Sequence, residues 1–159
     1  MRETFAKELE SYMELNTEVW LVLCDVGYGI FDVHREKFKE RVINAGAAEF
    51  SGMAICCGLA IEGKVPFFYS ITPFALWRPA EVIRNYVNHE ELNVKIVTSG
   101  RGRDYFQDGF SHGAGDDVAL LKEVWYNIKS YRPDKKEQIP KMFNEMAANN
   151  KPCYLNLRR

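Results

Sequence analysis

Glu49 is a lone carboxylate in a stretch of small and apolar residues. The segment that contains it, residues 44–74, reads NAGAAEFSGMAICCGLAIEGKVPFFYSITPF. The neighbours of Glu49 carry no charge, and they include Ala47, Ala48, Met53, Ala54, Ile55, Gly58, Leu59 and Ile61. A surface helix would show a charged stripe, whereas here the next charge is Glu62, so we expect the residues around Glu49 to be buried. A buried carboxylate is costly and needs a partner or a chemical task.

A glycine-rich loop gathers most of the remaining candidate side chains. Residues 99–115, with the acidic pair that follows, contain GRGRDYFQDGFSHGAGDD. The loop and this pair concentrate charged and titratable groups: Arg101, Arg103, Asp104, Asp108, His112, Asp116 and Asp117. Loops of this length in a compact domain are usually functional. A single histidine in a polar loop is more often simply solvated, so the loop by itself defines no reaction.

Several familiar sites are excluded by their spacing. VGYG at residues 26–29 follows an apolar run but lacks GxGxxG, and GxxxxGK[ST] does not occur, which argues against dinucleotide and P-loop sites. The four cysteines, Cys24, Cys56, Cys57 and Cys153, have neither CxxC spacing nor a zinc-type histidine pattern. We interpret them as reduced core thiols of a cytosolic protein.

Composition limits the number of domains and the kinds of partner that we expect. A chain of 159 residues with 47% hydrophobic and 27% charged residues fits one domain with a substantial core. The net charge is -1 and the basic residues are scattered, so nucleic acid is not expected as a partner. The apolar runs have the length of strands and the N-terminus has no apolar signal region, so we expect no membrane association and a cytoplasmic location.

Hydrophobic periodicity predicts helices alternating with strands. The predicted helices are 2–15, 47–62, 79–88, a short one from 116, and one after Pro133 and Asp134 that ends near 149. The predicted strands are 19–24, 41–44, 65–70, 94–98, 127–131 and 152–157. This order predicts an α/β fold: an open, mostly parallel sheet with helices on both faces and sites at the carboxyl ends of the strands.

The ordered motifs resemble the pyrimidine-binding domain of transketolase. They run along nearly the whole chain as MRETFA, LCDVG, RVINAGAAEFSGMAICCGLAIEGKVPFFYS, RPAEVIRN, LNVKIV, DGFSH and PCYLNLR. This module is the central one of the thiamine-diphosphate enzymes that transfer two-carbon ketol units. The resemblance implies a thiamine-diphosphate-binding fold over 1–159, with no diphosphate-binding domain and no C-terminal transketolase domain.

The resemblance also implies roles around the cofactor. Glu49 of NAGAAEF takes the place of the family's cofactor glutamate, which hydrogen-bonds a nitrogen of the aminopyrimidine ring and so activates thiamine diphosphate. Phe74 is expected to pack on that ring, with Ile71 and Trp77 beside it. Ile71 departs from the aromatic residue common there. From the residues alone, Glu49 can also be a helix-start residue bound by backbone amides, and the aromatics can be core or interface residues.

Substrate residues follow from the loop and the N-terminus. DGFSH resembles the family's DGPTH, which implies that His112 hydrogen-bonds the substrate carbonyl or hydroxyl and that Asp108 meets a sugar hydroxyl. Arg2 matches a position that contacts substrate phosphate, and Asp25 matches one near the cofactor or the dimer interface. A surface arginine and a strand-end aspartate are the plain alternatives for these two.

The expected partner is a second polypeptide. The family holds the diphosphate and Mg²⁺ with a domain carrying GDG, and this sequence has no GDG. We therefore expect either an excised domain or a natural subunit of a split enzyme, a heterotetramer acting on small sugars or sugar phosphates. Its apolar helix favours an obligate interface. Two alternatives stay open: a subunit of a 2-oxoacid decarboxylating carboligase related to deoxyxylulose phosphate synthase, and a non-catalytic scaffold or regulatory subunit.

Overall fold

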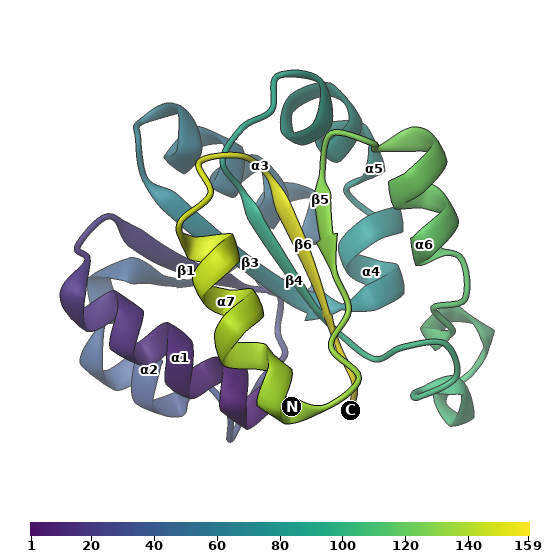
Figure 1. The fold of residues 1–159 in the computed structure, drawn as a ribbon, viewed down its shortest axis with the longest axis horizontal. Coiled ribbons are helices and arrows are strands. Elements are labelled where there is room, and N and C mark those ends of the chain that lie inside the picture. The colour runs from purple at the N-terminus through teal and green to yellow at the C-terminus, as the bar shows by residue number, and fades with distance from the viewer.

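Six parallel strands form one twisted sheet in the computed structural model, which describes residues 1–159 (Figure 1). The strands are β1 (Val19–Leu23), β2 (Val42–Asn44), β3 (Val65–Ile71), β4 (Lys95–Ser99), β5 (Lys129–Tyr131) and β6 (Cys153–Leu157). They lie in the order β2-β1-β3-β4-β6-β5, and every neighbouring pair is parallel. All six carboxyl ends therefore meet at one edge of the sheet, where the connecting loops form a continuous surface.

The helices supply the crossovers that parallel strands need. They are α1 (Arg2–Leu15), α2 (Asp32–Lys37), α3 (Glu49–Ile61), α4 (Thr72–Trp77), α5 (Ala80–Val82), α6 (Asp117–Ala119) and α7 (Ile139–Ala147). Short 3₁₀ turns occupy Lys39–Arg41, Phe106–Asp108, Phe110–His112 and Lys136–Gln138, and π-helical turns occupy Ile83–His89 and Leu120–Val124. None of the helices combines the length and the hydropathy that a bilayer-spanning segment needs.

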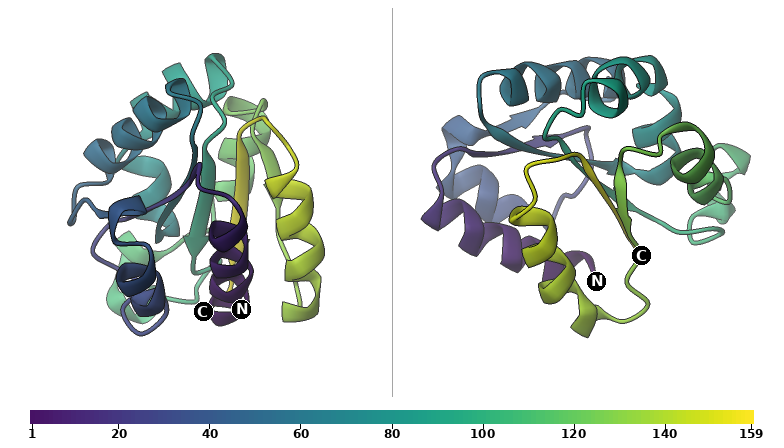
Figure 2. Two further views of the ribbon diagram at one scale, coloured as in Figure 1. Left: turned by 90° about the vertical axis from the view of Figure 1, so that its left-hand side faces the viewer. Right: turned by 45° about the horizontal axis from the view of Figure 1, so that its top comes forward.

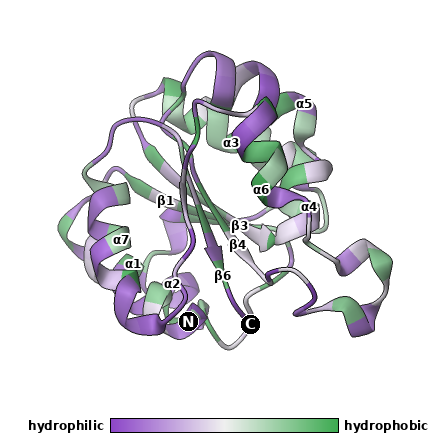
Figure 3. Cartoon of the chain, turned by 45° about the vertical axis from the view of Figure 1, so that its right-hand side comes forward, coloured by the Kyte–Doolittle hydropathy of each residue, from purple (hydrophilic) through white to green (hydrophobic).

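Two hydrophobic clusters, one on each face of the sheet, hold the helices in place. On one face α1, α2 and α7 pack through aromatic side chains, where the rings of Phe67 and Phe143 stack with centroids 5.8 Å apart. On the other face α3, α4 and the turns after them cover Phe68 and Tyr154. Figure 2 shows the sheet between these layers, and Figure 3 shows hydrophobic colouring along the central strands. The predicted sheet with helices on both faces is confirmed.

Most predicted elements are present, with small changes of boundary. Two helices were not predicted, α2 and α4, and each has only six residues. The predicted helix 79–88 begins as one turn of α-helix, α5, and continues as the π-helix Ile83–His89. Pro79 lies between α4 and α5, where its lack of a backbone N–H separates the two helices.

The expected burial of α3 is only half correct. Glu49 and Met53 are buried, but Ala47, Ala48, Ala54, Ile55, Gly58 and Ile61 are exposed. The physical reason is geometric, since a helix laid on a sheet buries one stripe and leaves the opposite stripe outside. Phe50 also lies on the outer stripe with half of its surface exposed. The chain therefore carries an uncharged outer face on α3.

All four cysteines are free and buried, as expected for core thiols. Burial raises the pKa of Cys57 to about 11. Burial also raises the pKa of Cys24 to about 12, and the negative charge of Glu49 adds to this rise. Thiols held this far above neutral pH are protonated and poorly nucleophilic.

Candidate functional site

Glu49 begins α3 at the carboxyl edge of the sheet and is only 2% exposed. The loop from β2 turns sharply at Gly46, whose φ is +72°, and brings the first turn of α3 against the end of β3. Ser70 Oγ donates to Glu49 Oε1 over 3.2 Å, and Arg78 Nη1 donates to Oε2 over 2.6 Å. The carboxylate is thus held by two side chains, and this satisfies a buried charge.

Arg78 connects Glu49 to an aromatic side chain. The guanidinium carbon lies 3.9 Å from the centre of the Phe74 ring, within the range of a cation–π contact. The Phe74 ring in turn meets the imidazole of His112 edge-on, with centroids 4.8 Å apart and an interplanar angle of 70°. The side chains of Glu49, Arg78, Phe74 and His112 therefore form a row, which we call the Glu49 row. Three of its members were predicted, and the fold brings them together.

A buried polar network fixes the start of α4, the helix that carries Phe74. Thr72 Oγ1 lies 3.1 Å from the carbonyl oxygen of Ser99 and 2.5 Å from that of Gly100. Asn156 Nδ2 on β6 donates to Thr72 Oγ1 over 3.0 Å. Since these groups are buried, each bond restrains its partner strongly. The Phe74 ring is positioned by strands β4 and β6 as well as by its own helix.

The network continues to the loop beyond β4. Tyr154 OH donates to Asp117 Oδ2 over 3.0 Å, and Arg132 Nη1 donates to the same oxygen over 2.6 Å. Arg101, at the start of the glycine-rich loop, donates through Nε to Asn156 Oδ1 over 2.9 Å and through Nη2 to the carbonyl oxygen of Asn156 over 2.8 Å. Arg101 and Asp117 of the loop region thus hold structure together and do not belong to the Glu49 row.

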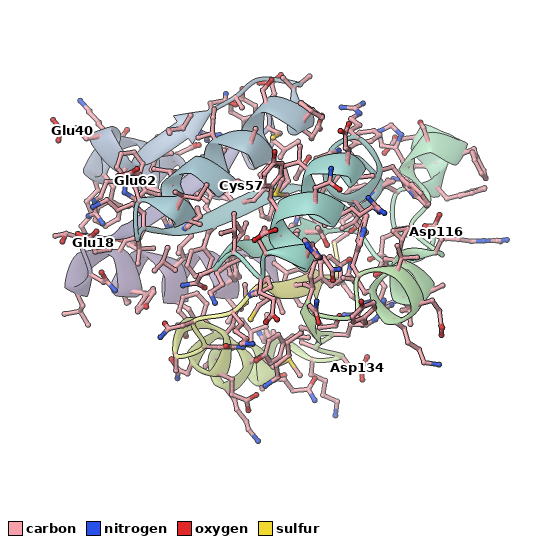
Figure 4. All side chains as sticks on the ribbon, turned by 90° about the horizontal axis from the view of Figure 1, so that it is seen from above. Glu18, Glu40, Cys57, Glu62, Asp116 and Asp134 are labelled. Carbon is pink, nitrogen blue, oxygen red and sulfur yellow. The ribbon has the colours of Figure 1, made fainter.

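The flanking residues lie at the same edge with different exposure. Ile71 ends β3 and is half-buried, while Trp77 at the end of α4 is half-exposed. The indole nitrogen of Trp77 donates to Asp116 Oδ2 over 3.1 Å, which ties α4 to the loop. Figure 4 labels Asp116 at one end of the molecule and Glu62, which follows α3, toward the other. Glu49 and Glu62 stand at opposite ends of α3, which is 13 residues long, so the length of the helix separates these two charges.

The remaining predicted residues do not join the row. Arg2 donates to Tyr105 OH over 3.4 Å, at the loop that follows β4. Asp25 follows β1 with a φ of +52°, its amide donates to Asn44 Oδ1 over 3.0 Å, and its carboxylate accepts from Tyr28. Asp108 is exposed on the 3₁₀ turn next to that of His112. Arg2 is the first residue of α1, Asp25 lies on the loop after β1, and Asp108 lies on a 3₁₀ turn in the connection that follows β4.

Sequence reasoning missed two members of the site, Ser70 and Arg78. Ser70 had no visible signal, because a serine at a strand end is common. Arg78 had one, since it is the only basic residue between Lys64 and Arg84 and a buried carboxylate needs a cation nearby. In the structure, both carboxylate oxygens of Glu49 accept hydrogen bonds from side chains, whereas the alternative interpretation expected backbone amides as the donors.

Comparison with known proteins identifies the family. The family model described as "Transketolase, pyrimidine binding domain" matches residues 1–159, so the chain belongs to that family. A putative transketolase C-terminal section from Methanocaldococcus jannaschii is 34% identical over 124 residues, covering 78% of this chain and 39% of that protein. A 6-deoxy-6-sulfo-D-fructose transketolase subunit from a Clostridium species is 28% identical over 161 residues, covering 100% of this chain and 49% of that protein.

A solved structure agrees with these relatives. It is described as a split gene transketolase, inactive beta4 tetramer, and superimposes with a TM-score of 0.85 at 30% identity. The match covers 99% of this chain and 51% of that chain. This chain therefore spans about half or less of the proteins it resembles, and it corresponds to their pyrimidine-binding part.

Proposed function

We propose that this chain is the pyrimidine-binding part of a split, thiamine-diphosphate-dependent transketolase that transfers a two-carbon ketol unit between small sugars or sugar phosphates. The observation that carries the proposal is the buried carboxylate of Glu49, which Arg78 links to the face of the Phe74 ring. A 2%-exposed acid with side-chain partners only, next to an aromatic wall, suits a planar ligand that bears ring nitrogens. Family membership supports the same cofactor.

The residues present fit an aminopyrimidine. The Arg78 guanidinium, a flat group with N–H donors at its edge, already lies on Phe74 and donates to Glu49. A ring of similar thickness with a hydrogen-bonding edge can make the same kinds of contact.

Each member of the Glu49 row then has a defined task. When bound, thiamine diphosphate supplies a thiazolium carbon that acts as the nucleophile once its proton is removed. Glu49 shares a proton with the pyrimidine nitrogen, Ser70 keeps the carboxyl group in orientation, and Phe74 supplies the stacking surface. His112, packed against Phe74, hydrogen-bonds the substrate carbonyl or hydroxyl.

Five further residues at the carboxyl edge of the sheet complete the proposed site. Asp108 meets a sugar hydroxyl, Arg2 meets a substrate phosphate, and Asp25 lies in the cofactor neighbourhood. Ile71 and Trp77 flank the ring. These assignments keep the roles implied by the family, and the position of all five at one edge of the sheet supports them.

A second subunit is part of the proposal. A GDG-bearing partner holds the diphosphate and Mg²⁺, and two copies of each subunit form a cytoplasmic heterotetramer. Two observations support this: the apolar outer face of α3, and the similarity to proteins described as a section, a subunit and a split-gene tetramer. Mass spectrometry of the polypeptide that co-purifies with this chain tests the partner directly.

Substitution of Glu49 tests the function. In the enzyme assembled with its partner, Glu49→Gln keeps the shape of the side chain but cannot share the proton, so kcat should fall by about 10²–10⁴-fold. Glu62→Gln, at the exposed end of α3, is the matched control and should keep wild-type turnover. Far-UV circular dichroism checks that both variants fold. Wild-type turnover by Glu49→Gln would refute the proposed role of this residue.

A further inference from the structure

Arg78 makes both of the contacts that the pyrimidine ring would need. Its guanidinium carbon lies 3.9 Å from the Phe74 ring centre, and its Nη1 lies 2.6 Å from Glu49 Oε2. We propose that Arg78 is a placeholder: it occupies the ring position in the cofactor-free chain and must move away before the aminopyrimidine can bind. This inference rests on the proposed function and adds a competing residue to the site.

The two occupants exclude each other for steric reasons. A planar group 3.9 Å from the Phe74 ring centre fills the layer directly above that face, so a second planar group cannot contact the same face there. On Glu49, Ser70 already occupies Oε1 and Arg78 occupies Oε2. A ring stacked on the same face of Phe74 would meet this carboxyl group from the position that the Arg78 guanidinium holds.

The position of Arg78 allows this movement at small cost. It follows the last residue of α4, and 44% of its side-chain surface is exposed, so its charge can be solvated without unfolding the helix. Water can solvate the Arg78 side of this ion pair. The buried partner is different, since Glu49 is 2% exposed and would be left as an uncompensated charge without a replacement. The pyrimidine ring would replace Arg78 as the hydrogen-bonding partner of Glu49.

The consequence is that Arg78 stabilises the chain without cofactor and weakens cofactor binding. In the assembled enzyme, Arg78→Met should bind thiamine diphosphate with Mg²⁺ about tenfold more tightly than wild type, as measured by isothermal titration calorimetry. The cofactor-free Arg78→Met enzyme should also melt at a lower temperature. Arg84→Met is the matched control, because Arg84 is exposed and its side chain bonds to the neighbouring Asn85, and it should change neither quantity.

A second measurement follows the Arg78 side chain of the wild-type protein itself. In ¹⁵N-labelled enzyme, the Arg78 guanidinium proton signal, assigned by its loss in Arg78→Lys, should exchange slowly with water before cofactor is added and fast afterwards. A signal that stays protected in the loaded enzyme would overturn the inference. Weaker or unchanged affinity in a folded Arg78→Met enzyme would overturn it too, while the proposed function would stand. If wild-type enzyme binds no thiamine diphosphate, the proposed function fails as well.

Discussion

Lys95 offers a direct test of the energetics of this fold. It lies on the central strand β4, its side chain is fully buried, and its ammonium group donates to the carbonyl oxygens of Asn149 and Lys151 just beyond α7. The bond to Lys151 is 2.8 Å long. Burial lowers the pKa of Lys95 from 10.5 to about 8, because the charged form loses its hydration.

The sign and size of the pH effect follow from linkage. The unfolded chain keeps the Lys95 proton up to about pH 10.5, whereas the folded chain releases it near pH 8. Between these values the unfolded state binds more protons, so the free energy of unfolding rises with pH across this window. At 1.36 kcal/mol for each unit between the two pKa values, the full gain is about 3 kcal/mol, of which about 2 kcal/mol falls between pH 7 and 9.5.

Urea unfolding of a matched pair isolates this contribution. Lys95→Met keeps the side-chain volume and removes the titrating group. Both members of the pair should carry Cys153→Ala, because the Cys153 thiol lies 3.8 Å from the Lys95 ammonium nitrogen and also ionises at alkaline pH. The free energy of unfolding of the protein that retains Lys95, minus that of the Lys95→Met variant, should rise by about 2 kcal/mol from pH 7 to 9.5. A flat or falling difference would refute the burial argument.

Two further pairs of substitutions are expected to give contrasting results, the first in stability and the second in cofactor binding against turnover. On α3, a Cβ at Gly52 would lie 3.0 Å from Cys24 Sγ, whereas a Cβ at Gly58 would meet nothing within 4 Å. In urea unfolding of the isolated chain, Gly52→Ala should therefore lower the free energy of unfolding by about 1–3 kcal/mol. Gly58→Ala should raise it by about 0.5–1 kcal/mol. Equal effects would contradict this packing. In the assembled enzyme, Phe74→Leu should weaken thiamine diphosphate binding about three- to tenfold, while His112→Asn should lower kcat about 100-fold at unchanged cofactor affinity. Cofactor affinity that falls equally in both would contradict this division of roles.

Strong periodicity made most of the fold predictable. Apolar residues recur at helical spacing over residues 2–15, and continuous apolar runs mark the strands 19–24 and 65–70. The alternation of helices with strands then implies the parallel sheet. The helices α2 and α4 escaped prediction because six residues make fewer than two turns, which is too short for a period to emerge. The segment TPFALW also continues the apolar run of β3, so composition does not separate the helix from the strand.

The site was predictable where a single residue type carried the signal. Glu49 is an acid among apolar residues, and the motif around it supplied a role to expect. Its pairing with Arg78 joins residues that are 29 positions apart, and no local pattern in the sequence indicates that β3 and α4 bring them together. The contact of Arg2 with Tyr105, 103 positions away, depends on the whole sheet in the same way.

Strand β6 follows both of its sheet neighbours in the sequence, and this order has a consequence for biosynthesis. This strand inserts between β4 and β5, and its Asn156 anchors Thr72 beneath the helix of Phe74. Because a ribosome releases the chain from its N-terminus, the earlier strands must wait with an incomplete sheet until these residues emerge. The helix of Phe74 is therefore anchored only after Asn156 has been synthesised, and a nascent chain stalled before residue 153 would expose the edge of β4 to chaperones or to aggregation.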